Sequence, residues 1–487
     1  MPVDFSQELR LAFLRAVSNA QNEEEGRVQI YRDFWEGEQG IVLTDRQEDY
    51  ILTLGSAEKT TRESLRQNVR GSMPGSWGNI CPRVVNVPKD RLSIDSEGIV
   101  PANPESTAYA DQVSEWWQLD GLDAKQKDIY EASLRDGVGA IIVDWNEEED
   151  RPTFVPNLIR SSEEGLVRFH YNVDNELIFA SKQWTIVDTL NPDGSGATRL
   201  TIYRPGLIDR FIGDDGFAGG WRPLVGDELE GKPNPQFWTD TGMQSGNPSG
   251  IPVIPFENPG GSELKEIIII QELLNHNLGT MDIVIDTHGL PVLWMVNANL
   301  PINTTTGVAQ LPDFGPGTGI NLNEGGSMGR LEAADIQKLF DGGVLSWLQI
   351  LALIKGWPLH FLDRSQIPPS GTALRQAEGS LISQVKDKQI VFGAAWSKAF
   401  DQARKIQAMR GGEKLLGSLK FNWTNPATVD PLLDAQAMEA KFNALQLPII
   451  SRLREAGYTQ DQIDQVKKDA QAGDDFGLVE FEAEADQ

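Results

Sequence analysis

Apolar residues recur at helical spacing in three long runs in the C-terminal half of the chain. The first run covers 262–286, where the apolar positions fall at i, i+3, i+4 and i+7 and so share one side of a helix. A second run covers 341–355, with a pair of glycines as a weak point near its start, and a third covers 370–409. A Gly- and Pro-rich insertion, 289–329, separates the first two runs. The pattern predicts a helical hairpin with an excursion at its tip, followed by a long helix.

The pattern differs in the N-terminal half. Helical spacing covers 4–35 and 105–134, whereas short apolar runs between turn signals indicate strands within 137–256. The expected strands are Val138–Val143, Leu166–Tyr171, Glu176–Ile186 and Arg199–Tyr203. Residues 79–92 are expected to be mixed, because two prolines interrupt them. Helices and strands in this order predict the α+β fold class.

The insertion and the C-terminal region are distinguished by their charge. Residues 289–329 contain two acids, Asp313 and Glu324, and no Lys or Arg. A structureless stretch of about 40 residues is uncommon in a compact domain, so a small β subdomain with a strand near 291–296 is favoured over a surface loop. Helical spacing returns over 430–468, whereas 474–487 carries six acids and no base and is expected to be disordered.

Net charge limits the classes of partner. The chain has 487 residues and a formal net charge of −28. Proteins that hold duplex DNA carry a basic surface, so this composition disfavours a tight, static grip on phosphates. The plain interpretation of the charge is an ordinary acidic protein.

Targeting and redox signals are few. The N-terminus lacks a basic segment followed by an apolar one, so we expect no signal peptide. The most apolar stretch, 344–354, is shorter than the ~20 residues of a spanning helix, so we expect no membrane anchor. The single cysteine, Cys81, excludes a disulfide within one chain and is consistent with a reducing cytoplasm.

Catalytic and cofactor-binding motifs are missing from the sequence. The chain has no phosphate-binding loop of the Gly-x4-Gly-Lys-Ser/Thr type and no nucleophile elbow. Its four histidines, at positions 170, 276, 288 and 360, are isolated from one another, so no metal site is expected. A Ser/His/Asp arrangement stays open at this stage. We predict that the protein is not an enzyme and that it has no cofactor.

Specific motifs surround the turn between the second and third helical runs. The second run is followed by Gly356-Trp357-Pro358-Leu359-His360-Phe361-Leu362. The third opens with Pro369-Ser370-Gly371-Thr372-Ala373-Leu374-Arg375, followed by Glu378 and by Lys386-Asp387-Lys388-Gln389. Upstream lie Tyr31, Gly37 and Asn86-Val87-Pro88-Lys89-Asp90-Arg91-Leu92. Together these motifs, over 31–411, resemble the portal (head-to-tail connector) proteins of tailed bacteriophages, which read Gly-x-Pro-Leu-His after one helix and Ser-Gly-x-Ala-Leu at the start of the next.

The resemblance implies a portal fold, with an α/β wing, a helical-hairpin stem, a small β-containing clip, a long wing helix and a helical crown. The boundaries it implies are 1–258 for the wing, 259–288 for the first stem helix, 289–331 for the clip, 332–356 for the second stem helix, 357–369 for the tunnel loop, 370–428 for the long wing helix and a returning strand, 429–473 for the crown and 474–487 for the acidic tail.

The resemblance also implies which residues carry the function. The tunnel loop would project into the channel and face DNA through Asp363, Arg364, Ser365, Gln366, Ile367, Pro368 and Pro369. The family-motif residues are Pro358, His360, Ser370, Gly371, Ala373, Leu374 and Glu378. The alternative for the loop is an ordinary exposed connector between helices.

The function implied by the resemblance is a ring of about twelve copies, a dodecamer, at one vertex of the capsid. Double-stranded DNA would pass through it during packaging and ejection. The implied partners are the large terminase subunit, a head-completion or tail adaptor protein, and the major capsid and scaffolding proteins, with assembly in the host cytoplasm. The alternative function is another capsid or tail structural adaptor without a DNA channel.

Overall fold

The computed structural model describes most of the residues between 7 and 427. The described ranges are 7–38, 78–94, 98–157, 165–185, 198–213, 221–223, 250–288, 293–298, 322–330, 336–362, 376–427 and 440–442, together with residues 463 and 466. The chain forms two compact units, of which one comprises Met1–Pro368 with Gln376–Pro426 and the other Pro369–Arg375 with Ala427–Gln487. All contacts below lie in the first unit, and most of the predicted helices at 430–468 and the acidic tail lie outside the described residues.

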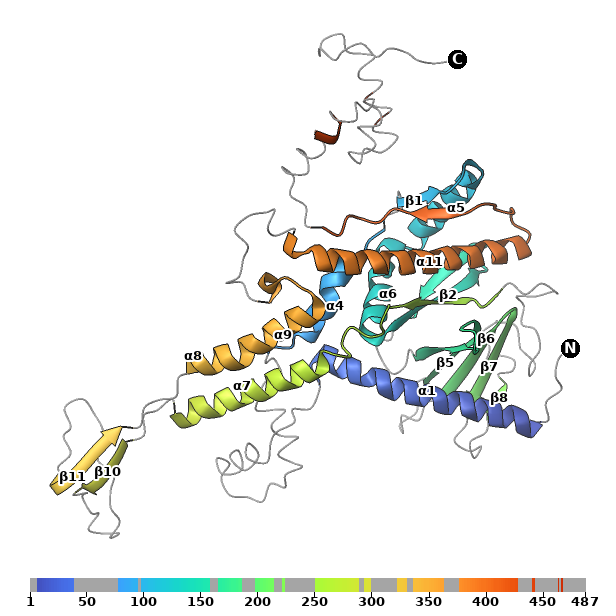
Figure 1. The fold of residues 1–487 in the computed structure, drawn as a ribbon. Helices are drawn as coiled ribbons and strands as arrows, with labels where there is room; N and C mark the ends of the chain where they lie inside the picture. The colour runs from blue at the N-terminus through green and yellow to red at the C-terminus, as the bar shows by residue number, and fades with distance from the viewer. Residues whose placement is uncertain are drawn as a thin grey trace. The chain divides into compact units, whose positions relative to one another are not determined.

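Figure 1 shows the helices of the described part of the chain. In chain order they are α1 (Gln7–Glu36), α4 (Cys81–Asp90), the 3-10 turn η2 (Pro104–Ser106), α5 (Thr107–Leu119), α6 (Leu122–Asp136), α7 (Ile268–His288), α8 (Ile336–Leu339), the π-helical turn η4 (Phe340–Leu345), α9 (Ser346–Lys355), the 3-10 turn η5 (Leu359–Phe361) and α11 (Gly379–Met409).

The expectation that residues 79–92 are mixed is wrong, because α4 occupies most of this segment. Pro82 lies in the first turn of α4, where the helix has no use for its N–H. Pro88 lies in the last turn, and buried Val84 and Val85 supply the apolar contacts that hold the helix. Proline position therefore matters more than proline number in this segment.

The single helix expected over 105–134 is two helices. The break falls at Gly121, which has a φ of +62° between α5 and α6. Both helices turn apolar faces to the core, where Trp116 and Trp117 are fully buried. A left-handed glycine thus redirects the chain without interrupting the apolar surface.

Two of the antiparallel sheets in the described part of the fold have three or more strands. A three-stranded sheet has the order β3-β2-β9, and a five-stranded sheet has the order β4-β5-β6-β7-β8. The strands are β2 (Val138–Asn146), β3 (Arg151–Pro156), β4 (Leu166–Tyr171), β5 (Leu177–Thr185), β6 (Thr198–Arg204), β7 (Leu207–Gly213), β8 (Trp221–Pro223) and β9 (Val253–Glu257). One apolar cluster, which includes Ala140, Val167 and Val253, joins the two sheets.

A helical hairpin leaves the sheets after β9. Helix α7 leads to a two-stranded ribbon, β10 (Leu293–Ala298) with β11 (Leu322–Arg330), and α8, η4 and α9 then run back alongside α7 (Figure 1). The weak point predicted at Gly342 and Gly343 coincides with the π-helical turn η4. The predicted hairpin is therefore present, although its second helix is divided.

Helix α11 forms the centre of the main core. It packs against β2, β3 and β9, and its Trp396 ring stacks on Phe400 with centroids 5.6 Å apart. The Trp396 indole donates a hydrogen bond of 2.8 Å to the hydroxyl of Tyr130 on α6, and Tyr130 stacks on Phe392 at 5.1 Å. After α11, the short strand β12 (Leu419–Phe421) pairs with β1 (Ile99–Pro101).

Among the described residues, no helix is long and apolar enough to cross a membrane.

Candidate functional site

Three of the sequence motifs meet at the buried side chain of Glu378. Arg91, from the upstream motif, places a guanidinium nitrogen 3.9 Å from Glu378 Oε2. His360, from the motif after α9, places Nε2 3.9 Å from Glu378 Oε1. Glu378 itself stands immediately before α11 and is 1% exposed. We call Arg91, His360 and Glu378 the Glu378 junction, because they bring α4, the end of the hairpin and the start of α11 to one point.

Aromatic contacts hold the junction in place. The Arg91 guanidinium lies 5.3 Å from the centre of the Phe361 ring, and His360 meets the same ring edge-on at 4.7 Å. Pro358 is extended and begins the 3-10 turn that carries His360. His360 and Pro358 therefore have a structural role: they turn the chain from the end of α9 toward the start of α11.

The first residue of this motif, Gly356, has a backbone conformation that favours glycine. It ends α9 in the left-handed conformation, with a φ of +62°. A Cβ at this position would lie 2.5 Å from Ser380 Oγ on α11. The left-handed backbone therefore favours glycine here, and an added Cβ would also force the Ser380 hydroxyl to move.

The predicted DNA-facing loop and most of the second motif lie outside the described residues. The described chain stops at Leu362 and resumes at Gln376. Residues Asp363, Arg364, Ser365, Gln366, Ile367, Pro368 and Pro369, and the motif residues Ser370, Gly371, Ala373 and Leu374, fall in that interval. Their role in facing DNA stays a prediction.

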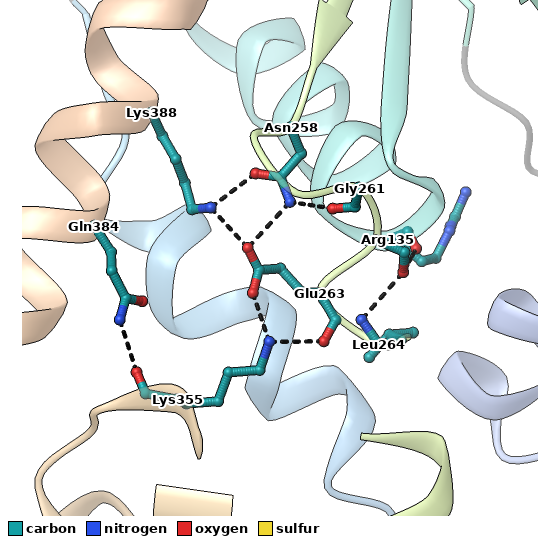
Figure 2. Close-up of polar contacts among 9 residues, drawn as sticks. Arg135, Asn258, Gly261, Glu263, Leu264, Lys355, Gln384 and Lys388 are labelled. Atoms are coloured by element: carbon teal, nitrogen blue, oxygen red, sulfur yellow. Dashed lines mark hydrogen bonds and ion pairs between the residues drawn. The ribbon is translucent and has the colours of Figure 1, made fainter. Parts of the chain in front are cut away.

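A second buried cluster lies where the hairpin meets α11, and sequence reasoning missed it (Figure 2). Glu263, just before α7, accepts one hydrogen bond of 2.7 Å from Lys355 and another of 2.7 Å from Lys388. Asn258 accepts from Lys388 at 2.7 Å and donates to Glu263 at 3.1 Å. We call Asn258, Glu263, Lys355 and Lys388 the Glu263 clamp.

The turn that carries Glu263 is itself fixed to α6. The Glu263 N–H donates to the carbonyl of Leu134 at 2.8 Å, and Ser262 Oγ donates to the carbonyl of Arg135 at 2.5 Å. Ser262 Oγ also accepts a hydrogen bond from the N–H of Leu264 at 3.1 Å. These hydrogen bonds fix the turn that carries the Glu263 carboxylate relative to α6.

The charges of the clamp decide the ionisation of Glu263. Burial alone raises the pKa of this carboxyl, but the ammonium groups of Lys355 and Lys388 outweigh burial and lower the pKa to about 2. Glu263 is thus a carboxylate throughout the physiological range. Sequence signals for this site are weak. Lys388 stands in the Lys386-Asp387-Lys388-Gln389 motif, but an acid before an apolar run and a distant lysine such as Lys355 are common features of acidic chains.

The outer side of α9 is unusually apolar for a surface. Ile350, Leu353 and Ile354 are 38%, 81% and 46% exposed and fall at i, i+3 and i+4, so they share one face. On the other side, Leu351 and Ala352 are buried. We call Ile350, Leu353 and Ile354 the α9 outer face.

The next features concern metal binding and the cysteine thiol in the described part of the chain. No group of three or more His, Cys, Asp or Glu side chains that could hold a metal ion occurs among the described residues. Cys81 is fully buried, and burial raises the pKa of its thiol to about 12. Cys81 is therefore a protonated core residue rather than a nucleophile.

Comparison with known proteins identifies two curated relatives. The portal protein of Mycobacterium phage D29 is 21% identical over 394 residues, which cover 77% of this chain and 76% of that protein. The portal protein of Mycobacterium phage L5 is 21% identical over 395 residues, with the same coverage of 77% and 76%. No protein-family model matches the chain. The resemblance predicted from the sequence motifs is therefore confirmed, and this chain is similar to phage portal proteins over 77% of its length.

Proposed function

We propose that the chain is a phage portal protein, which forms a ring of identical copies at one vertex of the capsid and gives double-stranded DNA its passage. The observation that carries the proposal is the similarity to two portal proteins over 77% of the chain. The α9 outer face supports assembly into a ring. Packaging ATP hydrolysis belongs to another component in this proposal, and the protein acts as a structural channel.

The α9 outer face argues for contact with a second copy. A helix that is apolar on all sides is normally covered on all sides. Helix α9 is covered on one side by α7 and the core, whereas Leu353 on the other side is 81% exposed. A contact between non-equivalent surfaces of neighbouring copies covers such a face in every copy when the ring closes.

The channel proposal rests on charge and on the tunnel loop. Each copy carries a net charge of −28, so the bulk of a ring repels DNA phosphates. Arg364 is the only base among residues 363–369, and a ring would present one copy per subunit. Each contact with phosphate would be weak and screened by salt over a Debye length of ~8 Å, so DNA could slide past.

The β10–β11 ribbon supports a docking role for the clip, 289–331. Two strands alone are marginally stable in water, so the ribbon gains from a further partner. Trp294 and Val296 are exposed and lie on one face of β10, since they are two residues apart. In our proposal this segment contacts the large terminase subunit during packaging and a head-completion or tail adaptor protein afterwards.

Imaging of the purified protein tests the ring directly. We expect negative-stain images of rings with a central hole, and loss of the rings in Leu353→Asp. The matched control is Val173→Asp, because Val173 is another exposed apolar residue, at 104%, but lies in the β4–β5 turn. Both variants should keep the circular dichroism spectrum of the parent. A folded parent that stays monomeric at micromolar concentration would refute the ring.

The tunnel loop is tested by packaging. Arg364→Glu, and separately a deletion of residues 365–367, should leave ring assembly intact and reduce DNA packaging or retention. Unchanged packaging in both variants would place the constriction elsewhere in the chain.

A further inference from the structure

We propose that Glu263 is a positioning residue, whose carboxylate fixes the orientation of the α7–α9 hairpin relative to α11. The proposal concerns the fold of one chain, so it does not rest on the proposed function. Its basis is the arrangement of the Glu263 clamp, which connects three segments that are distant in sequence.

The clamp lies at the only end of the hairpin that is attached to the rest of the described fold. Glu263 precedes α7, and Lys355 is the last residue of α9, so the clamp joins the two legs of the hairpin at their base. Lys388 is on α11, and Gln384, one turn earlier, donates a hydrogen bond of 2.8 Å to the carbonyl of Lys355. Both legs are therefore tied to two successive turns of α11 (Figure 2).

The bonds of the clamp are directional and shielded from water. The side chains of Glu263, Lys355 and Lys388 are 14%, 11% and 8% exposed. Lys355 donates to the carboxylate at 2.7 Å and also to the backbone carbonyl of Glu263 at 2.8 Å, so its ammonium group is fixed at two points. Charge-assisted hydrogen bonds of this length tolerate little displacement, whereas apolar contacts allow neighbouring helices to slide.

Apolar residues surround the clamp. They bury apolar surface between the hairpin and α11 but do not set the angle between them. Leu264 and Ile267 follow Glu263 and are fully buried, and so are Leu381 and Val385 on α11. These contacts hold the hairpin against α11 but do not select one angle among several with similar burial. The clamp adds that selection, because its acceptors and donors coincide in one arrangement only.

Stability alone is a poor explanation for the clamp. Two ammonium groups and one carboxylate lose water together, and apolar side chains of similar size often stabilise a buried position as well or better. Removing one partner leaves buried charge without compensation, which is strongly destabilising. The two explanations of the clamp, a role in orientation and a role in stability, therefore predict different results for a variant in which all three charges are replaced together.

Distances between two spin labels separate these explanations. In full-length protein, Gln337→Cys on α8 and Lys398→Cys on α11 provide two exposed label sites, while buried Cys81 stays unlabelled. Labelled chain is diluted into an excess of unlabelled chain, so that distances between copies do not contribute. Double electron–electron resonance then reports the orientation of the hairpin relative to α11.

We expect one narrow distance in the parent and a shifted or broadened distribution in Glu263→Gln, with a lower melting temperature. The triple variant Glu263→Leu, Lys355→Met, Lys388→Met should regain the melting temperature of the parent but keep the altered distribution. Glu263→Asp retains the charge on a shorter side chain, so it should give a narrow distribution at a shifted distance.

The control is Asp209→Asn, which removes another buried carboxylate, held by Arg204 within the β6–β7 hairpin. It should lower the melting temperature and leave the label distance unchanged. A parental distance distribution in the triple variant would overturn the proposal. Should the triple variant not fold, a parental distribution in Glu263→Gln would overturn it as well.

Discussion

A carboxylate held between two lysines responds to acid differently from one in water. The pKa of Glu263 is lowered from 4.5 to about 2 by Lys355 and Lys388, against the opposing effect of burial. A lowered pKa in the folded state means that the stabilising contribution is fully present above the ordinary pKa of a glutamate. It is lost progressively as the pH falls from about 4.5 toward 2.

We therefore predict that the Glu263 carboxylate makes folding acid-sensitive in this window. A shift from 4.5 to about 2 corresponds to a loss of about 3 kcal/mol of unfolding free energy on full protonation. Glu263→Gln lacks this component, so its stability should approach that of the parent as the pH falls. Urea unfolding at a series of pH values measures both curves. Parallel curves between pH 4.5 and 2 would contradict the assignment.

At the residue level, the sequence motifs contain all three residues of the Glu378 junction but only one residue of the Glu263 clamp, Lys388. Arg91, His360 and Glu378 each stand in a recognisable motif, although nothing in the sequence shows that the three meet. Glu263 and Lys355 stand 92 positions apart, and charge pairs can be inferred from spacing only within a helix turn or two. Tertiary charge clusters of this kind need the fold.

At the level of elements, periodicity predicted those parts that carry their own signal. The strand expected at Leu166–Tyr171 is β4, with the same bounds. Strands β3 and β11 were not predicted, because prolines and glycines interrupt their apolar pattern. They are strands because of their partners: Pro152 pairs with Trp145, and Gly329 lies under Trp294, where a Cβ would be 2.5 Å from the indole.

The π-helical turn η4 allows a prediction about the second leg of the hairpin. An added Cβ at Gly342 meets no atom within 4 Å, so alanine fits there. Alanine favours helical backbone over glycine, and Gly342→Ala should stabilise the hairpin by roughly 0.5–1 kcal/mol. Hydrogen exchange of the amides in 336–355 should slow accordingly.

Gly356→Ala is the matched control for this prediction. Gly356 has a φ of +62°, and its Cβ would lie 2.5 Å from Ser380 Oγ, so the same substitution should destabilise the protein there. Destabilisation by both variants would contradict the prediction for Gly342.

At the level of the whole molecule, the sequence predicted a hairpin with an insertion and a long following helix, and α7, α9 and α11 agree with this. The path between Leu362 and Gln376 lies outside the described residues, so the tunnel loop could be argued only from resemblance. Contacts between copies also leave only an indirect trace in one chain. In our proposal the α9 outer face is such a trace, because its apolar side chains are exposed in the single chain.

Assembly of an acidic chain into a ring should depend on salt in a defined direction. Neighbouring copies that each carry a net charge of −28 repel one another, and this repulsion is screened as the Debye length falls from ~30 Å at 0.01 M to ~8 Å at 0.15 M salt. The α9 outer face is apolar and loses nothing by screening. We therefore predict that ring formation, followed by sedimentation velocity, increases over this range of salt.

Two substitutions at Leu353 distinguish the apolar contact from the charge. Leu353→Asn removes apolar surface without adding charge, and Leu353→Asp adds one negative charge per copy at a position that is 81% exposed in the single chain. If the face packs against a neighbour, both variants should weaken assembly, and salt should rescue Leu353→Asp more than Leu353→Asn, because only the former adds repulsion. Assembly that weakens as salt rises would mean instead that ion pairs, and not the α9 outer face, hold the copies together.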